Sequence, residues 1–127
     1  MFLETSIPIN ERPHKRLEVW KQSIDLVSLV YKKTKAFPRE EEFGLTSQLR
    51  RAAVSVPSNI AEGLTTRTKN DKLRFLNIAQ GSLSEIDTQL EIAKNLEYLD
   101  DTSFVIILER LVVIQKLLSG LIRNIHG

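Results

Sequence analysis

Residues that could carry out catalysis are scarce in this chain of 127 residues, which has two histidines and no cysteine. Without cysteine the chain has no disulfide, no thiolate zinc site and no cysteine nucleophile. Glu11 and His14 have the Glu-x-x-His spacing of di-iron helical bundles, but Pro13 lies between them and a second such pair is missing. The other histidine, His126, is the penultimate residue, and no GxxxxGK phosphate loop occurs. We therefore expect no catalytic residues, no metal site, no cofactor and no enzyme activity.

Basic side chains are the other group with a recognisable chemistry, because they can neutralise phosphates. The candidate nucleic-acid-binding residues form two local groups, one in the second expected helix and one near the start of the third: Arg50, Arg51, Arg67, Lys69, Lys72 and Arg74. The amides at a helix N-terminus add attraction for phosphate in the second group. The alternative is an ordinary solvated surface, which is the common role of exposed lysines.

The overall charge does not decide between these two roles. The formal net charge is only +2, and the excess lies in residues 1–38, with seven Lys/Arg against four Asp/Glu. A monomer would present a dilute basic patch, whereas an oligomer could gather copies of it on one surface.

The elements that must position these residues are helices. Residues 1–16, with Pro8 and Pro13, are expected to form an irregular arm. After the arm, apolar residues recur at steps of three and four and predict an amphipathic helix that ends before Pro38: Leu17, Trp20, Ile24, Val27 and Tyr31. Trp20 and Tyr31 lie on this spacing, so we expect them in the core rather than stacked on bases.

The second helix should begin near Leu45, after the acidic residues 40–42, and should end at Gly63. Its stretch SVPSNIAEG (residues 55–63) contains Pro57, which removes a backbone donor in mid-helix. Two interpretations remain: a continuous, kinked helix whose freed Ala53 carbonyl is bonded by Ser55, Ser58 or water, or a break with Ser55 as a new N-cap. The apolar pattern continues through Ile60, which favours the kink.

Two further helices complete the pattern. A capping box at residues 68–71 should start the third helix, and Gly81 in its interior predicts that something packs closely there. Asp101 is the expected N-cap of the fourth helix, which should run to about Asn124. No apolar run is long enough to span a bilayer and no export signal is visible, so a cytoplasmic protein is expected.

The fourth helix is apolar around more of its circumference than one bundle core can bury. The positions outside the expected core stripe include the candidate oligomer-interface residues Val105, Leu108, Val112 and Ile122. A thick core could also hide them, but a four-helix domain of this size has no central helix. We therefore expect a homo-oligomer.

Two long motifs carry a family resemblance: QLRRAAVSVPSNIAEG (residues 48–63) and RFLNIAQGSLSEIDTQLEIAKNLEYL (residues 74–99). Over residues 17–125 the chain resembles the four-helix-bundle family encoded by intervening sequences in bacterial 23S ribosomal RNA genes, often labelled S23 ribosomal proteins. It more distantly resembles the accessory variability proteins of diversity-generating retroelements. Those proteins form five-membered rings and bind nucleic acid together with a reverse transcriptase. Lys72 departs from the family pattern, where an aromatic residue is expected.

Together, residues and resemblance predict an all-α protein: an antiparallel up-and-down four-helix bundle over residues 17–127 with a kinked second helix. It should assemble into a ring-like homo-oligomer, a pentamer by the resemblance. Its expected function is that of a non-catalytic RNA- or DNA-binding accessory factor, with a reverse transcriptase as the partner that the distant resemblance implies. The alternative is a protein–protein interaction scaffold that binds no nucleic acid.

Overall fold

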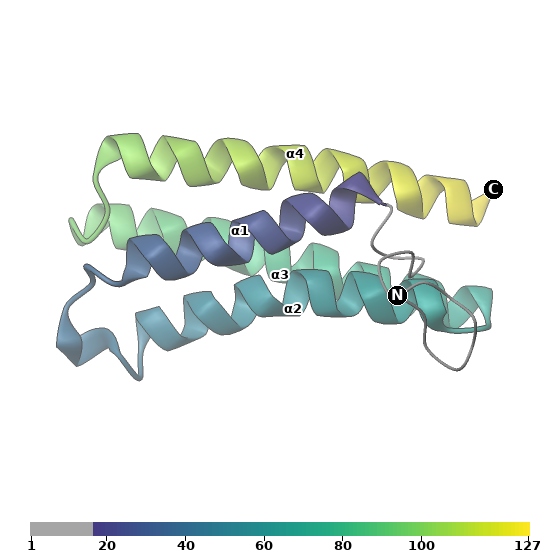
Figure 1. Cartoon of the computed structure of the whole chain (residues 1–127), viewed down its shortest axis with the longest axis horizontal. Coiled ribbons are helices and arrows are strands. Elements are labelled where there is room, and N and C mark those ends of the chain that lie inside the picture. Colours follow the sequence, from purple (N-terminus) through teal and green to yellow (C-terminus); the bar gives the residue numbers. More distant parts are fainter. Residues whose placement is uncertain (1–16) are drawn as a thin grey trace, which may run out of the picture.

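The computed structural model describes residues 17–127, which form four long α-helices and one short 3-10 helix (Figure 1). They are α1 (Glu18–Thr34), η3 (Arg39–Glu41), α2 (Leu45–Thr65), α3 (Lys69–Asn95) and α4 (Asp101–His126). No strand occurs in this described part. The predicted irregular arm, residues 1–16, lies outside the described residues. The all-helical fold with four helices, predicted from the apolar spacing, is confirmed.

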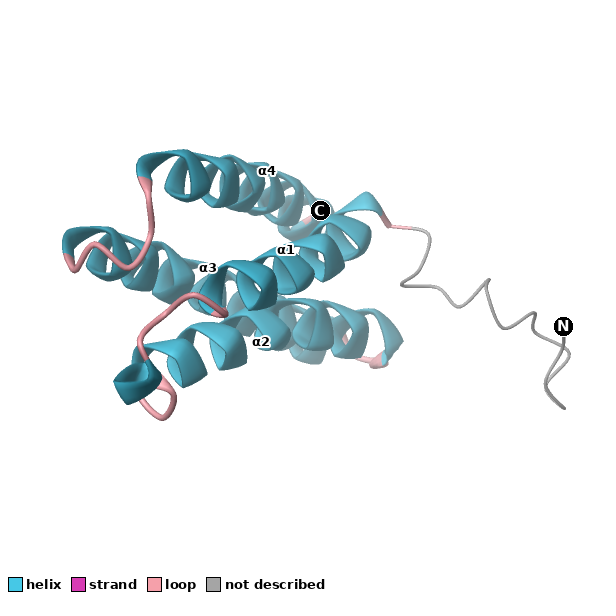
Figure 2. Ribbon diagram, turned by 60° about the vertical axis from the view of Figure 1, so that its left-hand side comes forward, coloured by secondary structure: helices cyan, strands magenta, loops and turns pink. Residues whose placement is uncertain are grey.

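The four helices run alternately up and down, and each packs against its neighbours in sequence, while α4 also packs against α1 (Figures 1 and 2). The contact between α2 and α3 is the most extensive. All four helices contribute fully buried aliphatic side chains to one continuous core, including Leu26, Leu49, Ile60, Leu83, Ile86, Leu111 and Ile114. Burial of these side chains is the main source of stability.

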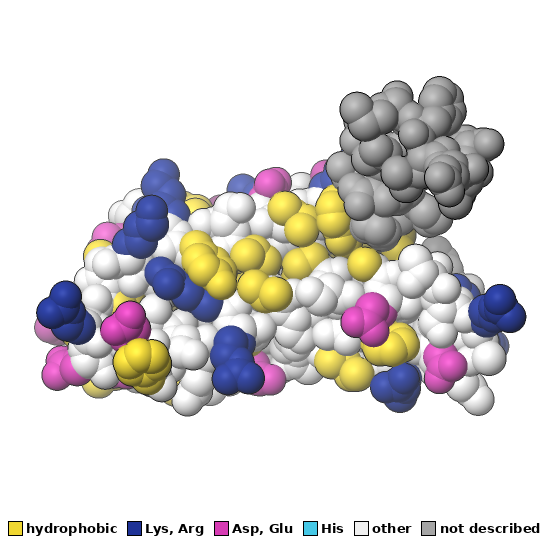
Figure 3. Space-filling model, turned by 60° about the horizontal axis from the view of Figure 1, so that its bottom comes forward, with side chains coloured by type: hydrophobic (Ala, Val, Ile, Leu, Met, Phe, Trp, Pro, Cys, Tyr) yellow, Lys and Arg dark blue, Asp and Glu magenta, His cyan; other side chains and the backbone are white. Residues whose placement is uncertain are grey.

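The face of α1 that meets the core agrees only in part with the expected one: Leu17, Trp20 and Val27 are half-buried and pack against the core, as predicted. Ile24 and Tyr31 are exposed, and the buried positions are instead Val19, Ser23, Leu26, Val30 and Thr34. The two polar members are tolerated because each hydroxyl donates to a carbonyl of its own helix, Ser23 Oγ to Trp20 O at 2.7 Å and Thr34 Oγ1 to Val30 O at 2.7 Å. Apolar side chains therefore remain on the outer surface formed by α1 and α2 (Figure 3).

Helix α2 passes through Pro57 without interruption, so the break at Ser55 is excluded; the kink stays a prediction. The carbonyls around the proline are bonded by side chains: Ser58 Oγ donates to Val54 O at 2.9 Å, and Asn59 Nδ2 donates to Ser55 O at 2.8 Å. Ser58 therefore bonds the carbonyl of Val54, the residue after Ala53, rather than that of Ala53 itself. Local side-chain donors of this kind are what a helical proline requires.

The two interior glycines have roles opposite to those expected. Gly63 does not end α2, which continues to Thr65. Gly63 is buried, and a Cβ there would lie 3.2 Å from Leu76 Cδ2 and 3.3 Å from Lys72 O, so its small size permits the close approach of α2 and α3. Gly81 is exposed and a Cβ there would meet no atom within 4 Å, so the predicted close packing is wrong.

The starts of α3 and α4 are fixed by side-chain caps. Thr68 Oγ1 accepts a hydrogen bond from Asp71 N at 3.1 Å, which confirms the start predicted for α3. The N-cap of α4 is Asp100, not Asp101: its Oδ1 accepts from Ser103 N at 2.7 Å. This bond is the main reason that the pKa of Asp100 lies below its ordinary value.

The connections at one end of the bundle are tied together by Glu41. Its Oε1 accepts from Leu45 N at 3.1 Å, at the start of α2, and its Oε2 accepts from the Tyr98 hydroxyl at 3.0 Å. The bond to Glu41 raises the pKa of Tyr98, whose ring also packs against Phe37 with centroids 5.6 Å apart. The acidic residues expected to favour the start of α2 thus do so through Glu41.

None of the described helices combines the length and apolarity needed to cross a membrane.

Candidate nucleic-acid interface

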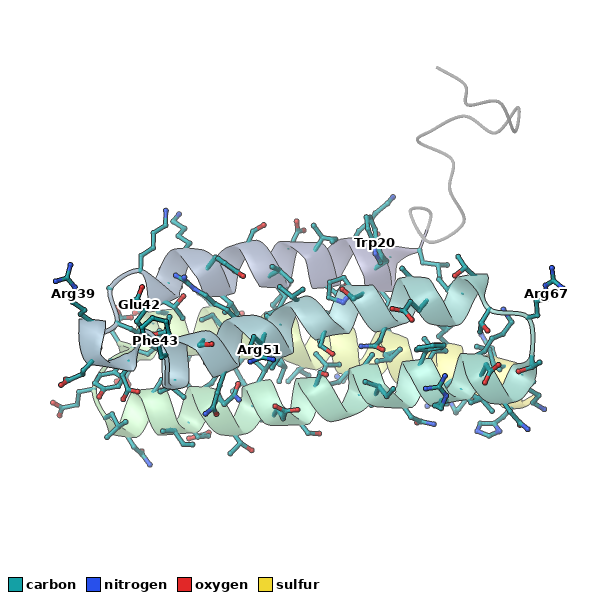
Figure 4. All side chains as sticks on the ribbon, turned by 90° about the horizontal axis from the view of Figure 1, so that it is seen from below. Trp20, Arg39, Glu42, Phe43, Arg51 and Arg67 are labelled. Atoms are coloured by element: carbon teal, nitrogen blue, oxygen red, sulfur yellow. The ribbon has the colours of Figure 1, made fainter. Side chains whose placement is uncertain are left out.

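Arg50 and Arg51 are neighbours in sequence but lie on different sides of α2. Arg50 faces α1: its Nε donates to Thr34 Oγ1 at 2.9 Å, its Nη2 donates to Tyr31 O at 3.4 Å, and its Cζ lies 4.6 Å from the Tyr31 ring centroid. These contacts complete the C-terminal end of α1, where carbonyls lack helical partners. Arg51 is exposed and lies on the α3 side of α2 (Figure 4). Arg50 therefore has a structural role, whereas Arg51 remains available.

The second predicted group surrounds the turn between α2 and α3. Arg67 and Lys69 are exposed, and Lys69 Nζ donates to His126 O at 3.1 Å, at the end of α4. Lys72 is half-buried, and the exposed Arg74 lies over the Phe75 ring at 4.4 Å and within 4.0 Å of Asp71. Among residues 17–127, Asp71 is the one carboxylate that forms an ion pair with these four basic residues, so most of their positive charge has no paired carboxylate there.

The structure does not bring the six predicted residues together. Arg51 lies near the start of α2 and Arg67 just beyond its end, so the helix separates them by about 20 Å at 1.5 Å per residue (Figure 4). A third basic position, missed in the sequence, is Arg39, which with Lys35 and Arg50 lines a pocket of about 390 Å³ beside α1. The apolar spacing of the long helices could not reveal Arg39, because it begins the short 3-10 helix η3 after Pro38.

The contact between α2 and α3 contains a polar seam that sequence reasoning also missed. The α2 side chains Gln48, Arg51, Ser55 and Asn59 follow spacings of three and four, so they lie on one face. Ser82 Oγ of α3 donates to Ser55 Oγ at 2.8 Å, and Asn59 Nδ2 donates to the same Oγ at 2.9 Å. The polar spacing within residues 48–59 was the available signal. Alongside the seam lies a pocket of about 330 Å³, lined by Gln48, Arg51, Ala52, Ser55, Ser82 and Glu85.

The four candidate interface residues of α4 divide into two kinds. Val105 and Val112 are 47% and 37% exposed, respectively, whereas Leu108 and Ile122 are half-buried and pack against the core. Ile106, Val113 and Leu117 are exposed as well.

Within residues 17–127 no cluster of three or more histidine, cysteine or acidic residues could hold a metal ion.

The arrangement defines a class of protein: an all-α four-helix bundle with basic groups at both ends of one helix and an apolar outer surface on α4. More specifically, the chain belongs to the family of 23S rRNA-intervening sequence proteins, whose family model matches residues 15–120. It is similar to a solved protein of unknown function from the S23 ribosomal protein family of Bacteroides thetaiotaomicron VPI-5482. The two share 26% sequence identity with a TM-score of 0.75, over 83% of this chain and 95% of that one. Comparison with curated proteins gives no match.

Proposed function

We propose that this protein is a non-catalytic, oligomeric accessory factor that binds nucleic acid through phosphate contacts. The observation that carries the proposal is the basic turn, which we define as Arg67, Lys69, Lys72 and Arg74, with its largely uncompensated charge. Arginine and lysine at such a position bind phosphate without requiring a defined sequence. The expected cytoplasmic location and a reverse transcriptase partner belong to the same proposal.

Oligomerisation would strengthen this binding. In a ring every copy contributes one basic turn, and a strand that contacts several copies at once gains affinity without new kinds of contact. The exposed Val105 and Val112 of α4 support such an assembly, because several exposed apolar side chains on one helix favour a partner surface that covers them. The family resemblance favours a pentamer.

The proposal is tested by replacing Arg67 and Arg74 together with alanine and measuring the affinity for a single-stranded oligonucleotide at several salt concentrations. Loss of two phosphate contacts should reduce the slope of log K against log salt by about 1.4, or 0.7 per contact. Lys21→Ala with Lys32→Ala is the matched control, since both are exposed and lie on α1. Equal slopes in the two double variants would remove the basic turn from the proposal.

A second candidate function is a protein–protein scaffold, which the exposed apolar side chains of α4 favour. Salt separates the two functions, because apolar docking does not weaken steeply as salt rises whereas phosphate binding does. Size-exclusion chromatography with light scattering and absorbance at two wavelengths, at low and high salt, measures mass and bound nucleic acid together. A clean oligomer that carries no nucleic acid at low salt favours the scaffold.

A further inference from the structure

The pocket beside the polar seam places an arginine and a glutamate on opposite walls without pairing them. Arg51 comes from α2 and Glu85 from α3, and both line the pocket of about 330 Å³. Neither side chain forms an ion pair or hydrogen bond within residues 17–127. Because the two opposite charges do not form an ion pair with each other, both can bind a ligand in the pocket.

The two walls differ in the hydrogen bonds they can offer. On the α2 wall, Ser55 Oγ already accepts from Ser82 and Asn59, so its own hydroxyl hydrogen is left to donate, as are the N–H groups of Arg51. On the α3 wall, Glu85 offers two acceptor oxygens.

This division restricts the chemistry of the ligand. A simple anion would be repelled by Glu85 and a simple cation by Arg51. A neutral group with neighbouring donors and acceptors fits both walls. Among the nucleobases, guanine has two adjacent N–H donors, N1 and N2, that match the two oxygens of a carboxylate, and it has the acceptors O6 and N7 that arginine binds in a bidentate manner. Adenine, cytosine and uracil each place an acceptor beside their Watson–Crick donor.

We propose that the pocket binds an unpaired guanine base of a single-stranded nucleic acid, with N1 and N2 donating to Glu85 and O6 and N7 accepting from Arg51. Single-stranded segments are where proteins read base edges in RNA, because the bases are not stacked in a duplex there. The inference rests on the proposed nucleic-acid function and adds base specificity to it. The basic turn supplies affinity for phosphate, and the pocket supplies the preference for one base.

The test uses the full-length protein and three fluorescein-labelled 12-nucleotide RNAs that are uridine except for one central guanosine, inosine or adenosine. Fluorescence anisotropy should give a Kd about tenfold lower for guanosine than for adenosine, since one bidentate pair discriminates by roughly that factor or more. Inosine lacks the N2 amino group, so its Kd should lie between the two.

Glu85→Gln should reduce the preference for guanosine to less than about twofold, because one carboxylate acceptor is replaced by a donor. Glu91→Gln is the matched control: Glu91 is an exposed residue of the same helix, and its replacement makes the same change in charge. Circular dichroism melts of both variants check that the bundle is intact.

Three results would overturn the inference. Equal Kd values for the three RNAs, with a steep salt dependence, would remove the guanine pocket but leave the proposed function in place. An equal loss of preference in Glu85→Gln and Glu91→Gln would assign the effect to net charge. No binding of any RNA at low salt would overturn the proposed function as well, and would leave the pocket to a polar segment of a protein partner.

Discussion

Helices α2 and α4 both place one face in the core, but their remaining faces differ. Outside its core face α2 carries Gln48, Arg51, Ser55 and Asn59, of which Ser55 and Asn59 are hydrogen-bonded at the boundary with α3, and its one exposed large apolar side chain is Val54. Outside its core face α4 carries Val105, Ile106, Val112, Val113 and Leu117, all more than one third exposed. A helix with a polar outer face can leave that face in contact with solvent, whereas an apolar outer face favours a second surface that covers it. The difference supports the proposal that ligands bind along α2 and its contact with α3, whereas copies of the chain assemble through α4.

The largest expected effect comes from two adjacent residues of α4, one on each face. Leu111 is fully buried, so Leu111→Ala should lower the free energy of unfolding by about 3 kcal/mol, through lost transfer energy and a cavity. Val112→Ala should change it by less than about 0.5 kcal/mol at protein concentrations low enough to keep the chain monomeric. Urea denaturation measures both values. A large loss for Val112→Ala in the dilute monomer would contradict the assignment of its face to assembly.

A second pair of variants examines the shape of the α2–α3 contact. Gly63→Val should destabilise the protein by about 2 kcal/mol, because its side chain would overlap Leu76 and the Lys72 carbonyl. Gly81→Ala should stabilise it by up to about 1 kcal/mol, since the position is open and helical. Thermal melts of the two variants should therefore shift in opposite directions. A tolerated Gly63→Val would mean that α2 and α3 can separate at this point.

Much of the fold could be predicted from the sequence, because spacings of three and four are strong in α2, α3 and α4. The orientation of α1 could not, since it carries two apolar stripes and the buried one includes Ser23 and Thr34. Their burial depends on hydroxyl bonds to the helix's own carbonyls, which apolar counting ignores. The candidate site was only partly predictable for a similar reason: sequence adjacency grouped Arg50 with Arg51, whereas Arg50 is bound to the end of α1.

A third prediction concerns assembly directly. Val105→Lys with Val112→Lys should leave the melt of the dilute protein within a few degrees of wild type, because both side chains are exposed in the monomer. The same double variant should reduce the mass measured by light scattering, since charges buried without partners disfavour an interface. Lys substitutions at Ser84 and Thr88, exposed residues of α3, are the control. An unchanged mass would place the interface elsewhere.

The smallest expected effect on stability concerns the side chains that bond the first backbone amides of α2 and α4. Asp100 caps α4 through Ser103 N, and Glu41 reaches Leu45 N from four residues before α2. The bond from Ser103 holds the folded-state pKa of Asp100 below the ordinary 3.8, so the carboxylate contributes stability above that pH and loses it as pH falls through the lower folded value. Asp100→Ala should therefore lower Tm by a few degrees at pH 7, and the difference from wild type should shrink under acid conditions.

Asp101→Ala is the control for this last effect, because Asp101 lies in the first turn of α4 without capping it. It should act on Tm less than Asp100→Ala does, through the helix dipole alone. Asp100→Asn retains an accepting oxygen, so it should keep most of the cap and lose the dependence on pH. If Asp100→Ala and Asp101→Ala instead lowered Tm equally at pH 7, negative charge near the helix N-terminus would matter more than the hydrogen bond from Ser103 N. That result would contradict the role of Asp100 as the N-cap that fixes the start of α4.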